Sequence, residues 1–323
     1  MITPSEHFFL GLSRSGFHRI RYFDWGDPHA AETVVCVHGL TRNAHDFDRL
    51  AERLAARYRV ITVDIVGRGG SDWLRDPADY SYGQYQTDMT ALLARLDVAR
   101  VHWIGTSMGG FLGMLLAAQA GTPLRSLLVN DVGPFIPKAA LQRISDYVGL
   151  DNRFSSIEAV ERHLRKVHAP FGPLTDRDWY EMARNGHRRL PDGSYGLAYD
   201  PTIVNNVRER IEDVVLWPVW DRIACPVLAL RGAESDLLKP DTAREMTQRG
   251  PKAKLVELPG IGHAPALMSG DQIDLVEDWL RNQAWFRCRV SCRAFPGSAA
   301  ICRHCTTTCA RPATSWRHGP VNA

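Results

Sequence analysis

Two kinds of apolar pattern alternate along most of this chain. Short, almost wholly apolar runs, such as residues 33–37 and 227–230, are typical of strands that are covered on both faces of a sheet. Stretches with apolar residues three or four positions apart, such as residues 82–96, predict helices. Because strand and helix follow each other repeatedly, we predict an α/β fold with a mostly parallel sheet and helices on both faces.

The same pattern sets the bounds of the individual elements. The predicted strands are residues 8–10, 18–23, 33–37, 60–63, 101–104, 124–129, 227–230 and 254–258. The predicted helices that flank them are residues 47–58, 82–96, 111–120, 241–248 and 271–285. Glycine-rich or polar stretches follow the ends of several strands, and in sheets of this kind function collects at the carboxyl ends of the strands.

The strand and helix alternation stops between residues 133 and 221. The helical segments predicted there are residues 138–148, 157–167 and 176–185. Pro191-Asp192-Gly193 predicts a turn, and no run resembles the earlier apolar strands. We interpret residues 133–221 as an insertion into a core domain that consists of residues 1–132 and 222–286.

A candidate nucleophile lies between an apolar strand and a helical run. Ser107 is the central residue of Gly105-Thr106-Ser107-Met108-Gly109, which has the Gly-x-Ser-x-Gly spacing of a nucleophile elbow. Such a turn strains the backbone of its central residue, so its close neighbours must be small. Five residues of this kind can also arise by chance, so the assignment depends on whether partners for the serine occur at other strand ends.

A serine hydroxyl needs a histidine as base, and the histidine needs an acceptor that fixes its tautomer. His263 follows the last predicted strand in a glycine-containing loop, and we predict that it is the base. Asp236, which follows the strand at residues 227–230, is the preferred acid because the chain order is then serine, acid, histidine. Asp131 and Glu234 are the alternatives, since each also lies at a strand end.

The oxyanion formed during acyl transfer needs preorganised donors. We predict that they are two backbone N–H groups, one from Met108 directly after the serine and one from Leu40 in the loop after the strand at residues 33–37. His38 in the same loop is expected to have a structural role by hydrogen bonding within the loop.

These motifs together resemble those of the α/β-hydrolase superfamily, in particular its carboxylesterase-like members with a serine nucleophile and a helical cap. The matching motifs are His38-Gly39, Asp64-x-x-Gly67-x-Gly69-x-Ser71, Gly105-x-Ser107-x-Gly109, Ser235-Asp236 and Gly262-His263. The resemblance implies an eight-stranded sheet whose second strand runs antiparallel, and a helical cap formed by residues 133–221. It also implies that residues 64–71 are a structural turn.

The family hosts many reactions, so the fold alone does not define the substrate. Relatives that act on epoxides or haloalkanes carry aspartate at the elbow, so Ser107 favours acyl transfer to water and a cofactor-free, metal-free carboxylesterase for small or medium esters. Lactonases, thioesterases, perhydrolases, hydroxyalkanoate-oligomer hydrolases and C–C bond hydrolases of ring-fission diketones are alternatives. A receptor that binds a small molecule on the same fold is the non-enzymatic alternative.

Three side chains are candidates for substrate binding. Arg42 lies beside the predicted oxyanion loop and could pair with a substrate carboxylate, or could simply face solvent. Phe135 and Trp179 of the insertion could line an apolar pocket, or could belong to the core of the insertion itself.

Composition and charge agree with an ordinary soluble globular protein. The chain is 45% hydrophobic and 23% charged, with a net charge of +3. With this small net charge we expect no nucleic-acid partner. We also expect no membrane span, because the longest uncharged run, residues 101–124, is the elbow region itself.

The expected location of the protein is the cytoplasm. No signal peptide is expected at the start, and Cys36 and Cys225 are interpreted as free thiols. The oligomeric state stays open, with a homodimer as one possibility.

Residues 287–323 differ from the rest of the chain. They contain arginine and cysteine but no acidic residue, and they show no helical or strand period. Cys302, Cys305 and Cys309 with nearby His304 and His318 could suggest zinc or a disulfide, but the spacing fits no paired zinc motif. We expect an appended, poorly ordered segment that is not native to the catalytic domain.

Overall fold

The computed structural model describes residues 2–150, 152–205 and 211–293. The chain divides into two compact units, of which the first ends at Gln283 and the second begins at Ala284. The first unit contains the sheet, its flanking helices and the insertion. The described part of the second unit is the end of helix α10 (Gly270–Arg293).

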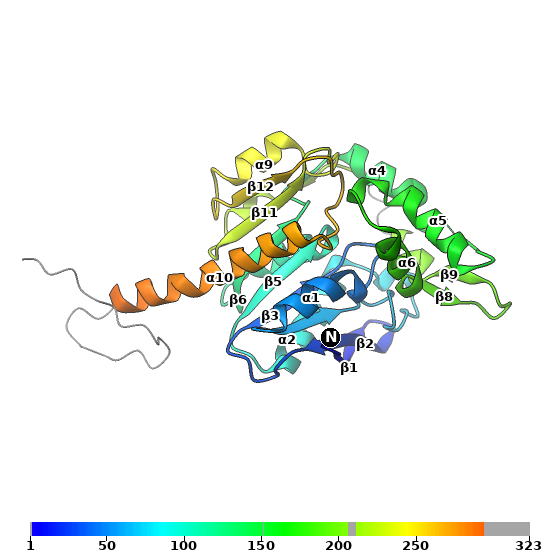
Figure 1. Ribbon diagram of the computed structural model, residues 1–323, viewed down its shortest axis with the longest axis horizontal. Helices are drawn as coiled ribbons and strands as arrows, with labels where there is room; N and C mark the ends of the chain where they lie inside the picture. Colours follow the sequence, from blue (N-terminus) through cyan, green and yellow to red (C-terminus); the bar gives the residue numbers. More distant parts are fainter. Residues whose placement is uncertain (1, 151, 206–210, 294–323) are drawn as a thin grey trace, which may run out of the picture. The chain divides into compact units, whose positions relative to one another are not determined.

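The centre of the first unit is an eight-stranded sheet with the strand order β1-β2-β4-β3-β5-β6-β11-β12 (Figure 1). Strand β2 runs antiparallel to both of its neighbours, and the pairs from β4 to β12 are all parallel. This confirms the predicted fold, including its antiparallel second strand. The strands are β1 (Ser5–Ser13), β2 (Gly16–Trp25), β3 (Thr33–Val37), β4 (Arg59–Val63), β5 (Val101–Thr106), β6 (Leu124–Asn130), β11 (Val227–Gly232) and β12 (Lys254–Leu258).

Helices cover both faces of the sheet because alternate strand residues point to opposite sides. Val35 and Val37 of β3 belong to an apolar cluster that includes residues of α2 and α3. Val34 and Cys36 belong to a second cluster that includes residues of α1 and α10. The helices of the core domain are α1 (Asp48–Leu54), α2 (Tyr82–Leu96), α3 (Met108–Ala117), α9 (Pro240–Met246) and α10, with the short 3₁₀ turns η1 (Ala44–Phe47) and η2 (Pro77–Asp79). Three further short elements belong to residues 133–221: α8 (Trp217–Trp220), η3 (Ala169–Phe171) and η4 (Pro201–Val204).

The helix bounds follow the local capping chemistry. Helix α2 has the predicted bounds: the Ser81 side chain accepts a hydrogen bond from the Gln84 N–H at its start, and Asp97 ends it in a left-handed conformation with φ of 50°. Helix α10 instead continues to Arg293, beyond the end predicted at residue 285. The prediction that residues 287–293 have no helical structure is therefore wrong, and residues 294–323 lie outside the described part of the chain.

The insertion between β6 and β11 contains the three predicted helices and two small sheets. The helices are α4 (Lys138–Tyr147), α5 (Ile157–Val167) and α6 (Asp176–Asn185), and the sheets pair β7 (Phe135–Ile136) with β10 (Val214–Val215) and β8 (His187–Arg189) with β9 (Tyr195–Leu197). The β7–β10 pair joins the two ends of the insertion. Strands β8 and β9 flank the turn predicted at residues 191–193, but strands of two or three residues are too short to show a period in the sequence.

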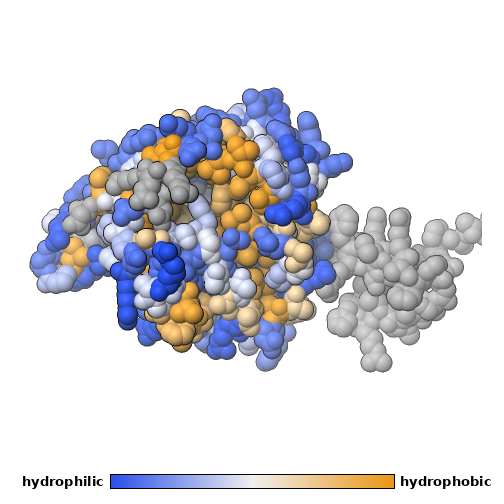
Figure 2. Space-filling model, turned by 180° about the vertical axis from the view of Figure 1, so that it is seen from behind, coloured by the Kyte–Doolittle hydropathy of each residue, from blue (hydrophilic) through white to orange (hydrophobic). Residues whose placement is uncertain are grey.

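On the face seen in Figure 2, hydrophilic residues lie mainly around the outline and apolar residues gather in the middle. Separately, the edge strand β1 exposes Phe8, Leu10 and Leu12, which alternate with residues that face the core. Among the described residues, no helix combines the length and the apolar character needed to cross a membrane.

Candidate active site

Ser107 lies in the sharp turn between β5 and α3. Its backbone has φ of 50° and ψ of −111°, a conformation that L-residues rarely adopt. The turn is tight because α3 packs directly against the strands: a Cβ on Gly105 would lie 2.2 Å from the carbonyl of Gly109, and a Cβ on Gly109 would lie 2.0 Å from the Val37 oxygen. The two glycines therefore permit the strained serine that the sequence predicted.

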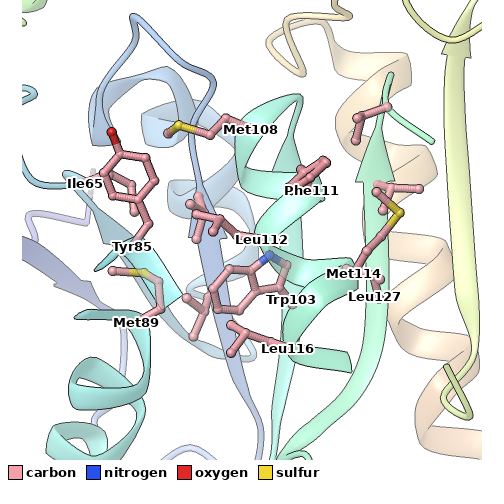
Figure 3. Close-up of a cluster of buried hydrophobic side chains, with 14 of the residues drawn as sticks. Ile65, Tyr85, Met89, Trp103, Met108, Phe111, Leu112, Met114, Leu116 and Leu127 are labelled. Carbon is pink, nitrogen blue, oxygen red and sulfur yellow. The ribbon is translucent and has the colours of Figure 1, made fainter. Parts of the chain in front are cut away.

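A buried apolar cluster supports the elbow from below. Trp103 of β5 donates a hydrogen bond from its indole nitrogen to the Gly109 carbonyl over 2.9 Å. Figure 3 shows Trp103 beside Leu112 and Leu116 of α3, within the cluster that also contains Met108 and Phe111. The position of Ser107 is thus determined by the hydrophobic core as well as by the turn.

We expect Gly105→Ala to destabilise the protein, because the added methyl group would overlap the backbone of α3. Overpacking of this kind costs about 1–3 kcal/mol, and here the obstruction is backbone that has little freedom to move. Thermal unfolding of the variant measures the loss. Gly270→Ala is the control, since a Cβ at Gly270 meets no atom within 4 Å; an equally small effect of both substitutions would contradict the packing argument.

His263 connects Ser107 to a carboxylate. Its Nε2 lies 2.9 Å from the Ser107 Oγ, and its Nδ1 lies 2.7 Å from Oδ2 of Asp131. A carboxylate can only accept, so Nδ1 of His263 carries the proton and donates to Asp131. The neutral ring then accepts at Nε2 from the serine hydroxyl, which is the arrangement of a base that can deprotonate Ser107.

The carboxylate of Asp131 is fully buried, and both of its oxygens accept hydrogen bonds. Besides His263, its Oδ2 accepts from the Ser235 hydroxyl over 2.6 Å, and its Oδ1 accepts from the Gly232 N–H over 2.9 Å. Asp131 follows β6 with φ of 56°, and its own N–H donates to the Leu230 carbonyl. These contacts hold the carboxylate in one orientation toward His263.

The prediction that Asp236 orients His263 is wrong in this structure. The Asp236 carboxylate instead pairs with Arg143 of α4, whose Nη2 lies 2.9 Å from Oδ1. The preceding residue, Ser235, is the one that joins the site, through its bond to Asp131. Asp131 was weighed as an alternative because it ends a strand, and the geometry selects it.

The loop after β3 lies against the elbow. A Cβ on Gly39 would come within 3.7 Å of the Ser107 Cβ, and Gly39, Leu40 and Ser107 line one cavity. Within the described residues, neither the Leu40 N–H nor the Met108 N–H is used in another hydrogen bond. Both donors are therefore available beside Ser107.

Two buried side chains, the imidazole of His38 and the guanidinium of Arg68, hold this loop in place. His38 accepts from the Ile65 N–H at Nε2 over 3.0 Å and donates from Nδ1 to the Gly39 carbonyl over 2.7 Å. Burial lowers the pKa of His38 to about 4, so the ring stays neutral and can do both. Arg68 donates from Nε to the Leu40 carbonyl over 2.9 Å. The structural role expected for residues 64–71 thus includes holding the Leu40 peptide.

The cavity over Ser107 encloses about 770 Å³, counting its opening to solvent. Its floor comes from the core domain and includes Gly39, Leu40, Thr106, Ser107 and His263. Its opposite wall comes from the insertion and includes Arg143, Ile144, Tyr147, His168, Phe171 and Met182. The insertion therefore closes the side of the cavity that faces the serine.

His168 is a wall residue that the sequence did not reveal. Its side chain is almost completely buried, and its ring packs against Phe171 in a tilted arrangement with centroids 4.5 Å apart. Burial lowers the pKa of His168 well below its ordinary value, and the charge of Arg42 adds to this effect. The cavity wall thus presents a neutral imidazole, which can donate one hydrogen bond and accept another.

The other predicted binding residues have different positions. Arg42 lines the cavity, but its guanidinium is buried and paired with Asp46, with Nη2 2.6 Å from Oδ1, so it does not face solvent. Trp179 packs in the apolar core of the insertion with Val160 and Leu164. Phe135 forms the short strand pair at the base of the insertion. The prediction that Phe135 and Trp179 line the pocket is wrong, because neither belongs to the cavity wall.

Among the described residues, no group of three histidine, cysteine or acidic side chains is arranged to hold a metal ion. The cysteines and histidines of the possible zinc motif, Cys302, His304, Cys305, Cys309 and His318, lie outside the described residues.

Comparison with known proteins identifies the family. Residues 32–267 match the family described as alpha/beta hydrolase fold. The chain belongs to this family and is a hydrolase of the α/β fold. A 3-hydroxybutyrate-oligomer hydrolase of Cupriavidus necator is 42% identical to it over 282 residues, which cover 84% of this chain and 96% of that protein.

Two crystal structures show the same architecture. An alpha/beta hydrolase from Novosphingobium aromaticivorans is 36% identical with a TM-score of 0.78, and the match covers 87% of this chain and 99% of that chain. A Rickettsia typhi protein is 33% identical with a TM-score of 0.81 over the same shares of the two chains.

Proposed function

We propose that this chain is a serine esterase that cleaves small or medium carboxylic esters through an acyl-enzyme. The observation that carries the proposal is the continuous path from Ser107 through His263 to the buried Asp131, with distances of 2.9 Å and 2.7 Å. In this proposal Ser107 is the nucleophile, His263 the base and Asp131 the acid that orients it. The Leu40 and Met108 N–H groups form the oxyanion hole.

The reaction follows from this arrangement. The Ser107 oxygen attacks the ester carbonyl carbon while its proton moves to Nε2 of His263, and Asp131 stabilises the resulting imidazolium. The carbonyl oxygen takes up negative charge beside the two free N–H groups, each of which is worth about 10²–10³ in rate. His263 then protonates the leaving alkoxide. Water attacks the acyl-enzyme with His263 again as base, and the acid product leaves.

Residues 133–221 act in this proposal as a cap over the site. Their helices supply the cavity wall opposite Ser107, so they would select the substrate and exclude bulk water from the acyl-enzyme. Support for the substrate class comes from the relative in Cupriavidus necator, whose name gives 3-hydroxybutyrate oligomers as its substrate. We therefore propose oligoesters of short hydroxy acids as the substrates to test first.

A substrate panel tests the proposal. It contains 4-nitrophenyl butyrate, the linear dimer and trimer of 3-hydroxybutyrate, a γ-lactone and a ring-fission diketone, each assayed with the wild type and with Ser107→Ala. We expect the esters and oligomers to be hydrolysed, and Ser107→Ala to lose that activity. Turnover of the diketone alone would instead indicate a C–C bond hydrolase, and ligand binding without turnover of any compound would indicate a receptor.

A further inference from the structure

We propose that Arg143 binds a free carboxylate at the far end of the ester substrate, and that Asp236 occupies this binding position until the substrate arrives. The inference rests on the proposed esterase function and adds a specificity for acid-terminated substrates. Linear oligomers of hydroxy acids have this chemistry, because each carries one free carboxylate beside its ester bonds.

The first argument is position. Arg143 lies on α4, in the wall of the cavity that contains Ser107, so a substrate bound at Ser107 can extend toward its guanidinium. Asp236 follows β11 in the core domain, so the pair joins the insertion to the core at the cavity wall. A carboxylate that reaches Arg143 meets a planar donor that suits bidentate binding, and Asp236 already demonstrates this geometry with bonds to both Nε and Nη2.

The second argument is exchangeability. The side chains of Arg143 and Asp236 are 41% and 42% exposed, so Asp236 can return to water when another carboxylate takes its place. Burial raises the pKa of Asp236, but the hydrogen bond and charge of Arg143 outweigh it and lower the pKa, so Asp236 is an anion while it is paired. Once released to water, an aspartate side chain is also an anion at neutral pH. The guanidinium keeps a carboxylate partner throughout, so no buried charge is left unpaired.

Arg42, the other cavity arginine, is not suited to this role. Its side chain is 7% exposed, and Asp46 holds it through bonds to both Nε and Nη2. A substrate carboxylate that took the place of Asp46 would leave the Asp46 side chain, which is 21% exposed, as an unpaired anion in a poorly solvated place. The two arginines therefore differ in exposure, and of these two only Arg143 has a carboxylate partner that water can solvate after the pair separates.

The test compares two esters that differ only in the distal charge: the 4-nitrophenyl monoester of adipic acid and its methyl-capped counterpart. Release of 4-nitrophenol gives kcat and KM for each, and the measured quantity is the ratio of kcat/KM for the acid to kcat/KM for the capped ester. We expect Arg143→Met to lower this ratio about tenfold, mainly through a higher KM for the acid. Arg143→Lys should lower it less, because a point charge remains.

Asp236→Asn separates the proposed carboxylate site from an ion pair that only stabilises the fold, because such an ion pair would not change the ratio of the two kcat/KM values. Removal of the competing carboxylate should raise the same ratio, by about threefold. Arg177→Met is the matched control: Arg177 pairs with Glu181 on α6, is 75% exposed, and does not line the cavity, so its ratio should equal that of the wild type. Thermal unfolding of each variant checks the fold.

The outcomes separate the two proposals. A ratio that moves in opposite directions in Arg143→Met and Asp236→Asn supports the carboxylate site. A ratio that moves in the same direction in both variants, or by less than twofold in both, overturns it while the esterase function stands. If the wild type releases 4-nitrophenol from neither ester, the esterase function fails and the carboxylate site fails with it.

Discussion

Replacement of Ser107 by alanine is expected to lower kcat for 4-nitrophenyl butyrate by about 10⁶-fold, the loss typical of a nucleophile within a triad. The reason is that no other hydroxyl or thiol in the described part of the cavity wall lies within hydrogen-bond distance of His263. The backbone at this position already tolerates a strained conformation, and alanine keeps the Cβ that packs near Gly39. The variant should therefore fold normally.

Initial rates at saturating substrate, together with thermal unfolding, check this expectation. Ser15→Ala, in the turn between β1 and β2, is a control that removes a serine hydroxyl outside the cavity. Activity of the purified Ser107→Ala protein within tenfold of the wild type would contradict the elbow assignment.

The second large effect is expected at Asp131. In Asp131→Asn the amide has no charge to stabilise the His263 imidazolium, and its NH₂ group favours the wrong tautomer of the ring, so kcat should fall by about 10⁴-fold. Asp236→Asn should cost less than about tenfold on the same neutral ester, because Asp236 pairs with Arg143 rather than with His263.

The two aspartates are a matched pair for this experiment. Both follow strands of the same sheet, and in both variants one carboxylate oxygen is replaced by an NH₂ group. Steady-state kinetics on 4-nitrophenyl butyrate distinguishes them. A greater loss of kcat in Asp236→Asn than in Asp131→Asn would show that the acid assignment from the structure is incorrect.

The fold could be predicted because its signals are local. The strands of the sheet appear as short apolar runs, and helix α2 shows apolar residues at helical spacing. The glycines at residues 105 and 109 indicate the sharp turn around Ser107. The order of motifs along the chain then defines the family. Helix α10 was predicted too short because apolar and polar residues alternate one by one in residues 286–293, and this alternation does not mark one face of a helix.

The acid could not be chosen from the sequence, because the choice depends on distance in space. Asp131 and Asp236 both end parallel strands that pair with each other, β6 and β11, and the sequence does not show which carboxylate points at His263. The structure shows that Ser235, one residue before Asp236, instead supports Asp131. Two adjacent residues thus have different roles: Ser235 hydrogen bonds the buried Asp131 carboxylate, whereas Asp236 pairs with Arg143 of the insertion.

The walls of the cavity were the least predictable part of the site. Arg143 lies on α4 and His168 directly follows α5, and the apolar periods of these stretches indicate helices but not which residues meet the core. Aromatic character was a poor guide there, since Trp179 packs inside the insertion while the polar Arg143 lines the cavity. The orientation of an inserted domain depends on contacts between residues that are far apart in the sequence, and a local sequence pattern does not indicate such contacts.

The measurement that tests the central claim most directly is labelling of the wild-type protein with a fluorophosphonate, followed by mass-spectrometric mapping of the modified peptide. The account predicts one labelled residue, Ser107, with labelling lost in Ser107→Ala and strongly slowed in His263→Ala, because His263 activates the hydroxyl at 2.9 Å. Absence of labelling, or modification of a different residue, would contradict the assignment of this site as a serine hydrolase centre.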